Sequence, residues 1–206
     1  MNTVHKVFPT CIFQKDVGLS SEHNQQLLTK IYEIRKRNPE SHGPIYQTKD
    51  DLHTLDEFKH LTLKIETAFT DILKYLDYKD YDFHINSMWG NVYNSAQGIE
   101  PHTHANNFYS GVYTLKCVMG FDSSMLLFSD PRPQANVFYP LVRKRTAENG
   151  NLAFVPTKEG ELILFPAWLQ HYTKPNKSKE HRVTISFNIQ LKGEMETHAS
   201  LQWARF

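Results

Sequence analysis

The stretch from residue 161 to residue 191, ELILFPAWLQHYTKPNKSKEHRVTISFNIQL, decides the fold that the sequence predicts. It holds an apolar run at 161–165, a second run that begins at His171, and a long run at 182–191. A polar segment at 175–180 separates the last two runs, which favours adjacent antiparallel strands. Short apolar runs between turn residues are typical of strands in a β-sandwich or barrel.

Further strands are expected before this stretch. From about Tyr81 onward, two sets of residues alternate, as they do along a strand with one buried face. Shorter runs of strand character lie at residues 111–118, 125–128 and 151–155. The sequence therefore predicts many short strands after residue 80.

Two helices are expected ahead of these strands. Ser20 or Ser21 caps the first helix, and Asn38-Pro39 ends it because the residue before a proline avoids the helical region. Thr54 and Glu57 fit a capping box at the start of the second helix. Apolar residues recur at helical spacing in both segments: Leu27, Leu28, Ile31 and Ile34 in the first, and Phe58, Leu61, Ile65, Phe69, Ile72 and Leu76 in the second.

Helices first and short strands afterwards indicate a chain that is mainly β with N-terminal helices packed on one side of a sandwich or barrel. A length of 206 residues fits one domain of ordinary to large size. We expect a single domain over residues 1–206, with a helical part at about 1–80 and a strand core at about 81–191.

The charge balance argues against two classes of partner. The chain has 23 basic and 22 acidic residues and a net charge of +1, which gives no reason to expect nucleic acid or an anionic membrane. No stretch approaches the ~18 consecutive apolar residues of a membrane-spanning helix. Cys11 and Cys117 form no CxxC or disulfide pattern, which indicates a reducing compartment. We expect a soluble cytoplasmic protein; a homo-oligomer is one arrangement that the sequence leaves open.

Three histidines are candidate metal ligands. His102 and His104 are two positions apart, so in an extended segment both side chains point to the same side. Such a pair alone is a weak signal, and a strand end with two partly exposed histidines is the ordinary alternative. His171 follows one expected strand and begins the next run. The combination of the pair with His171 is what indicates a shared metal.

Asp130 is the candidate carboxylate, although an Asp-Pro pair is a common way to open a turn. In a jelly roll, the strand that ends at Phe128 would run parallel to the strand that ends near His102. Both strands would leave the barrel at the end where the run from His171 starts. Asp130 would then meet the histidines, and two histidines with one carboxylate form the facial triad of non-haem iron oxygenases.

Arg182 is the candidate ligand of an acidic co-substrate. It opens an alternating apolar strand, so it is expected to point inward together with Thr184, although a surface arginine is the ordinary case. A buried arginine needs an anionic partner, and a carboxylate fits its fork of donors. Tyr113 either donates its hydroxyl to the same carboxylate or is an ordinary core tyrosine.

Six segments, in this order along the chain, resemble the iron(II)/2-oxoglutarate-dependent oxygenase superfamily. The likeness is greatest to a group of small predicted oxygenases from bacteria and their phages. It covers roughly half the chain, from about residue 89 to residue 188, and the opening VFPT at 7–10 also looks like this group. The segments are WGNVY at 89–93, HTH at 102–104, SGVY at 110–113, DPR at 130–132, LFPAW at 164–168 with His171, and RVTISF at 182–187.

The resemblance implies a double-stranded β-helix, or jelly-roll, core packed against the two helices. It implies a dioxygenase that uses Fe(II) and 2-oxoglutarate, hydroxylates an unknown substrate, and releases succinate and carbon dioxide. The co-substrate would be held by Arg182, helped by Tyr113 and Thr184. The metal and 2-oxoglutarate carry the chemistry, and the protein supplies ligation, orientation and shielding, with no catalytic residue beyond the metal site.

One position departs from the superfamily pattern. Most members carry a carboxylate two residues after the first histidine, where this chain has His104. Either Asp130 supplies the carboxylate beside His102 and His171, or His104 also binds, as in cupins. Two other functions stay open: a cupin-type metalloprotein that does not use 2-oxoglutarate, and a non-enzymatic jelly-roll structural or binding protein.

Overall fold

The fold is that of a computed structural model, which describes residues 3–40, 43–118, 125–132, 134, 137–138, 140–196 and 201–206. The strands are β1 (Phe13–Asp16), β2 (Tyr46–Gln47), β3 (Asp82–Tyr93), β4 (Ile99–His102), β5 (Tyr109–Lys116), β6 (Met125–Ser129), β7 (Leu152–Pro156), β8 (Glu161–Pro166), β9 (His171–Thr173), β10 (Arg182–Lys192), β11 (Glu194–Met195) and β12 (Ala204–Arg205). The helices are α1 (Ser21–Arg37) and α2 (Lys59–Tyr75), and the short 3-10 turns η1 (Leu52–Thr54) and η2 (Asp56–Phe58) precede α2.

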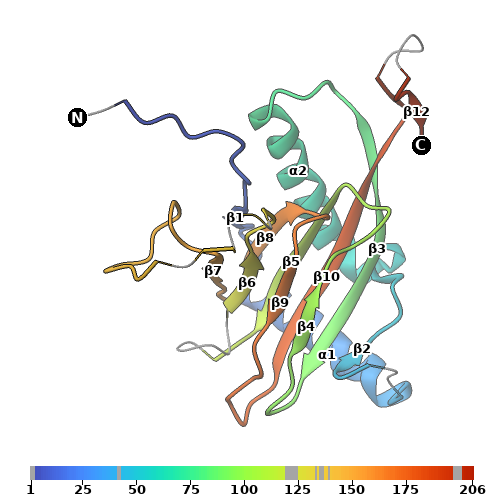
Figure 1. The fold of residues 1–206 in the computed structure, drawn as a ribbon. Helices are drawn as coiled ribbons and strands as arrows, with labels where there is room; N and C mark the ends of the chain where they lie inside the picture. The colour runs from blue at the N-terminus through green and yellow to red at the C-terminus, as the bar shows by residue number, and fades with distance from the viewer. Residues whose placement is uncertain are drawn as a thin grey trace.

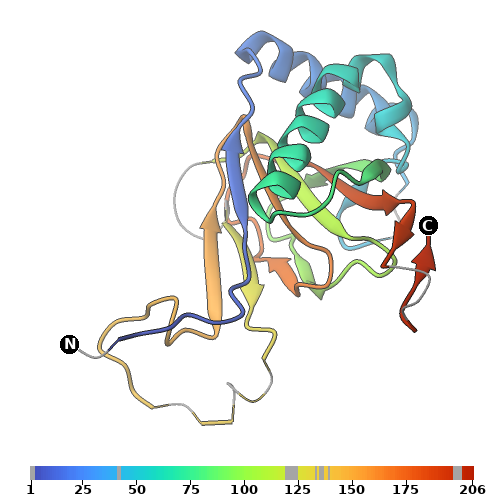
Figure 2. The ribbon, with the colours of Figure 1, turned by 90° about the horizontal axis from the view of Figure 1, so that it is seen from above.

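Two antiparallel sheets form the core of the fold. The larger sheet has the strand order β1-β8-β5-β10-β3-β2, and the smaller sheet has the order β4-β9-β6-β7. Strands that are distant in sequence lie side by side in both sheets, as in a jelly roll. Both helices cover the outer face of the larger sheet (Figures 1 and 2). The predicted fold class, a mainly β jelly roll packed against two helices, is confirmed.

Side chains alternate along β10 and so divide the two sides of the larger sheet. Val183, Ile185 and Phe187 pack into the apolar core shared with α1 and α2. Ser186 and Arg182 have the opposite parity and line a cavity on the other side of the sheet. Burial of each large apolar side chain in such a core contributes about 1.5–3 kcal/mol to folding.

A second apolar cluster lies on the cavity side, where the two sheets face each other. It contains Val112 of β5, Ile163 and Phe165 of β8, and Leu126 and Phe128 of β6. The rings of Phe128 and Phe165 meet edge to face, with centroids 5.0 Å apart. This apolar layer therefore joins the smaller sheet to the larger one.

The start of the first helix is confirmed and that of the second is corrected. Ser20 caps α1, since its hydroxyl accepts a hydrogen bond of 3.1 Å from the His23 amide. The expected capping box of the second helix is absent from the described residues. The Thr54 hydroxyl donates to the Asp51 carbonyl, the Glu57 carboxylate pairs with Lys30, and α2 begins only after two 3-10 turns.

The strand connections correct another expectation. His171 and Arg182 do not lie on adjacent strands, because β9 belongs to the smaller sheet and β10 to the larger one. The polar segment between them crosses from one sheet to the other instead of forming a hairpin. The expected direction of two other strands is confirmed: β4 and β6 are both antiparallel to β9, so they run parallel to each other.

None of the described helices is long and apolar enough to cross a membrane. The division into one domain over residues 1–206 stays a prediction.

Candidate metal and co-substrate site

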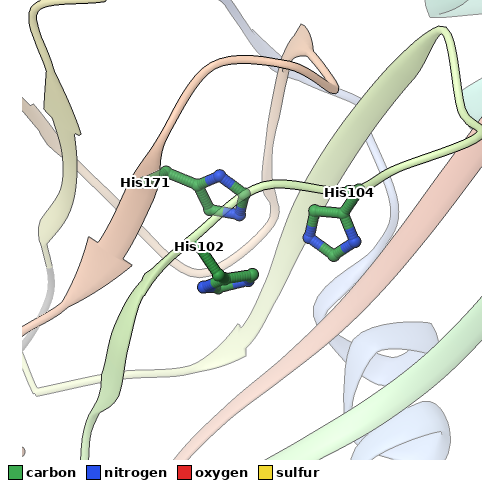
Figure 3. A group of neighbouring side chains, drawn as sticks. All are labelled: His102, His104 and His171. Carbon is green, nitrogen blue, oxygen red and sulfur yellow. The ribbon is translucent and has the colours of Figure 1, made fainter.

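Three histidines meet at one end of the space between the sheets (Figure 3). His102 ends β4, His104 follows it in the next loop, and His171 begins β9 directly opposite His102. Each offers one ring nitrogen, and these atoms all lie within 4.8 Å of one another. Imidazole nitrogens that converge from two neighbouring strands form a group that can hold a divalent metal.

Backbone carbonyls fix two of the three rings. The Nδ1 of His102 lies 2.8 Å from the Glu100 carbonyl, and the Nδ1 of His171 lies 2.9 Å from the Leu169 carbonyl. Because a carbonyl can only accept, each Nδ1 carries the proton and donates it. The Nε2 atom of each ring is then unprotonated, and its lone pair can bind a metal. A second ring nitrogen that donates to a carbonyl is the usual arrangement in metal-binding histidines.

The surroundings keep two of these imidazoles neutral. Burial is the main reason that the pKa of His171 is lowered to about 3; the hydrogen bond to the Leu169 carbonyl acts in the opposite direction, and the neighbouring His102 and His104 add to the lowering. Burial, with a smaller effect from His102, lowers the pKa of His104 to about 4. Both rings are therefore unprotonated at neutral pH, so a metal ion would compete with few protons for their nitrogens.

The histidines open onto a cavity of about 290 Å³ between the sheets. Residues of both sheets line it, including Trp89, Asn91 and Tyr93 of β3 and Thr173 of β9. Its volume lies near the lower end of the ~300–1,000 Å³ range of small-molecule sites. Such a cavity admits a small metabolite beside the metal-ligand group.

Arg182 lines the same cavity and is almost fully buried, with 2% of its surface exposed. Its Nε and Nη1 atoms have no hydrogen-bond partner, and none of the ion pairs among the described residues includes it. Burial lowers the pKa of the guanidinium, because a charged group without water or a counter-charge is unfavourable. A buried, unpaired guanidinium that faces a cavity is a site for an anion.

Tyr93 and Thr173, which no sequence pattern singled out, lie beside Arg182. Tyr93 is its cross-strand partner, and the guanidinium carbon lies 5.2 Å from the centre of the Tyr93 ring. The Tyr93 hydroxyl hydrogen-bonds the side chains of Thr173 and Thr184. Thr184, a predicted co-substrate residue, is thus buried on the expected face and close to Arg182. Trp89, Asn91 and Tyr93 are two positions apart on one strand, so their side chains lie on the same face, and this spacing could have identified Tyr93.

The structure places Tyr113 on the wrong face for a co-substrate residue. Its ring is fully buried in the core that the larger sheet shares with the helices. Its hydroxyl donates a hydrogen bond of 2.9 Å to Oδ1 of Asn24 in α1. The prediction that Tyr113 helps to hold 2-oxoglutarate is therefore wrong, because the odd-numbered positions of β5 face the helices.

Asp130 does not join the metal-ligand group, which among the described residues contains only the three histidines. Its carboxylate instead accepts two hydrogen bonds from the Arg132 guanidinium, at 3.0 and 2.8 Å, and one from the Arg132 amide. The Arg132 guanidinium holds the pKa of the Asp130 carboxyl below its usual range. The expectation that Asp130 meets the histidines is therefore corrected: it is His104 that lies with His102 and His171.

The strand core matches a known family of proteins. Residues 87–188 fit the family model described as "Putative 2OG-Fe(II) oxygenase". This range includes all three histidines and Arg182. No curated protein matches the chain.

Solved structures share the fold at low sequence identity. HygX from Streptomyces hygroscopicus, with nickel and 2-oxoglutarate bound, is 13% identical with a TM-score of 0.63, over 96% of this chain and 91% of that one. A prolyl-4-hydroxylase from Pseudomonas putida is 12% identical with a TM-score of 0.63, over 89% and 94%. The α-ketoglutarate-dependent epimerase SnoN, from nogalamycin biosynthesis, is 12% identical with a TM-score of 0.66, over 93% and 83%.

A double-stranded β-helix with a histidine group and a buried guanidinium lining one cavity has the groups that a non-haem metal oxygenase needs. By the family match over residues 87–188, about half of its length, this chain belongs to the 2-oxoglutarate- and iron(II)-dependent oxygenases.

Proposed function

We propose that His102, His104 and His171 hold a ferrous ion and that Arg182 holds the distal carboxylate of 2-oxoglutarate. With both bound, the site would carry out the overall reaction in which 2-oxoglutarate, dioxygen and a C–H bond give succinate, carbon dioxide and a C–OH group. The unpaired, buried guanidinium of Arg182 carries this proposal, because a carboxylate in the cavity would supply both the hydrogen-bond acceptors and the negative charge that it lacks.

The residues present fit both groups. Neutral imidazole nitrogens suit a ferrous ion. Ser186 of β10 pairs with Trp89, which lies beside the histidines. Arg182 is four residues away along the same strand, a distance of roughly 13 Å. The long arginine side chain and an extended five-carbon diacid can share that span. Tyr93 and Thr173, beside Arg182, line the end of the cavity where the distal carboxylate would lie.

An all-histidine group also suits a cupin-type metalloprotein that does not use 2-oxoglutarate. Arg182 separates the two functions. The cupin-type reading gives the guanidinium a structural role, yet its Nε and Nη1 have no partner. Release of succinate from 2-oxoglutarate, in a screen of candidate substrates, would support the oxygenase; turnover without succinate would support the cupin-type function.

The test is a calorimetric titration of 2-oxoglutarate into the metal-loaded protein under anaerobic conditions. We expect Arg182→Ala to keep the metal but to lose about 2–5 kcal/mol of co-substrate binding, because one partner of a buried charge pair is removed. Arg182→Lys should restore little, since lysine lacks the two parallel donors. Arg132→Ala, which removes a different arginine outside the cavity, is the control. Equal affinity in wild type and Arg182→Ala, or none in either, would contradict the proposal.

A further inference from the structure

We propose that Trp89, held by Asn91, is a positioning residue that keeps the His104 ring in the orientation needed to bind the metal. This inference rests on the proposed function, because it concerns the third ligand of the same metal. Trp89 itself lines the cavity onto which the histidines open.

His104 lacks the contact that orients the other two ligands. His102 and His171 each donate from Nδ1 to a backbone carbonyl. Among the described residues, no hydrogen bond joins the His104 ring to any protein group. An imidazole on a loop rotates about two side-chain bonds, so another contact has to limit its orientation.

Three neighbouring rings supply that contact by packing. The centre of the His104 ring lies 5.8 Å from that of Trp89, at an interplanar angle of 41°. On another side, His104 stacks on His171, with centres 5.1 Å apart and planes 15° apart. The His102 ring also meets the His104 ring edge to face, with centres 5.0 Å apart. Since His102 and His171 are themselves proposed ligands, Trp89 is the neighbour that contributes by packing alone.

Trp89 is in turn fixed by a buried asparagine. Its indole Nε1 donates a hydrogen bond of 3.1 Å to Oδ1 of Asn91, and Gln47 of β2 donates to the same oxygen at 2.9 Å. The Asn91 amide nitrogen donates to Thr184 at 3.2 Å and to Ser186 at 2.9 Å, both on β10. An indole can only donate, so the orientation of the Asn91 amide is settled by its neighbour.

The Asn91 side chain, at the centre of this network, has all of its hydrogen-bonding groups occupied. Asn91 is fully buried, and its amide oxygen and nitrogen each make two hydrogen bonds to side chains. Three strands, β2, β3 and β10, therefore hold the indole at one angle beside His104. Removing the indole would leave His104 with rotational freedom, which a metal would have to restrict on binding.

Metal affinity tests the inference without any need for the oxygenase substrate. Co(II) serves as the probe, measured by competition with a chelator, and its ligand-field absorption reports which groups bind it. We expect Trp89→Ala to weaken Co(II) about 10–100-fold, the range for loss of a residue that supports a ligand. Its spectrum at saturating Co(II) should resemble that of His104→Ala. Trp89→Phe, which keeps a ring, should recover part of the affinity.

Trp168→Ala is the matched control, because Trp168 lies three residues before His171 but is 56% exposed. It should bind Co(II) like the wild type. Circular dichroism checks that each variant is folded. If Trp89→Ala binds Co(II) as tightly as the wild type, with the same spectrum, the inference is wrong.

A second measurement leaves Trp89 in place. The chain has three tryptophans, so Trp168→Phe with Trp203→Phe leaves Trp89 as the single indole. Co(II) should quench its fluorescence at one equivalent, and His104→Ala should reduce that quenching. Unchanged emission in the presence of bound Co(II) would overturn the inference. If wild type and His102→Ala both take up no metal, the proposed function itself fails, and the role of Trp89 falls with it.

Discussion

At the scale of single residues, the metal-ligand group is unusual in carrying no negative charge. Its three members are imidazoles, and burial keeps His104 and His171 unprotonated. A divalent ion held by these ligands would keep its full charge until an anion binds beside it. We therefore expect metal and 2-oxoglutarate to strengthen each other's binding, since each would offset the charge of the other.

The choice between His104 and Asp130 as third ligand gives a prediction at the same scale. His104→Ala should weaken ferrous binding at least about 10-fold, because it removes a ligand. Asp130→Ala should leave metal affinity nearly unchanged, because that carboxylate is bonded to Arg132. Metal analysis after dialysis against graded chelator measures both. A large loss in Asp130→Ala beside a small one in His104→Ala would reverse the assignment.

At the scale of elements, the helices, the long strands and several short core strands could be predicted, but the short strands β1 and β2 could not. The strand expected at 182–191 is β10, at Arg182–Lys192, because eleven residues carry enough alternation to be recognised. In contrast, β1 and β2 have four and two residues, and their conformation comes from pairing with β8 and β3. No local period marks such segments.

The sequence did not always predict which face of a sheet a side chain lies on. His171 and Arg182 could be selected because each begins a recognisable run, and His102 because it pairs with His104 two positions along the chain. Tyr113 was assigned to the cavity, yet the register of β5 turns it toward Asn24. A shift of one position reverses every side chain of a strand, so parity has to come from the partner strands.

The strand that carries His102 gives a prediction at the element scale. A Cβ at Gly98, just before β4, would lie 2.7 Å from the Thr173 carbonyl oxygen and 3.0 Å from two further backbone atoms. Gly98→Ala should therefore push β4 from β9, at a cost of about 1–3 kcal/mol in the free energy of unfolding, and weaken metal binding. Gly43→Ala, whose Cβ meets nothing closer than 3.8 Å, is the control. Urea unfolding with metal titration measures both; identical values in the two variants would contradict this account.

At the scale of the whole molecule, the buried histidines link stability to pH in the metal-free protein. The folded-state pKa of His171, about 3, lies below the ordinary value of 6.5. The unfolded chain therefore takes up the proton first, so this contribution is complete above pH 6.5 and is lost as the pH falls toward 3. Between pH 7 and 5.5 the expected loss from His171 is about 1 kcal/mol.

Urea unfolding of the chelator-treated protein at these two pH values measures the effect. His171→Gln removes the titrating group and should show a smaller difference between the two pH values than the wild type does. Added metal should also reduce the difference, because it binds the neutral imidazoles of the folded state. Equal pH dependence in wild type and His171→Gln would show that the acid sensitivity arises elsewhere.

The placement of the two binding ends on different sheets has one more consequence. His171 belongs to the smaller sheet and Arg182 to the larger, so the separation between metal and guanidinium depends on how thick the apolar layer between the sheets is. Phe128 and Phe165, whose rings pack on each other and on the His171 ring, would then help to set which chain length of keto diacid fits. We therefore expect homologous diacids one methylene shorter or longer to be discriminated partly by the interior packing that sets the distance between the sheets.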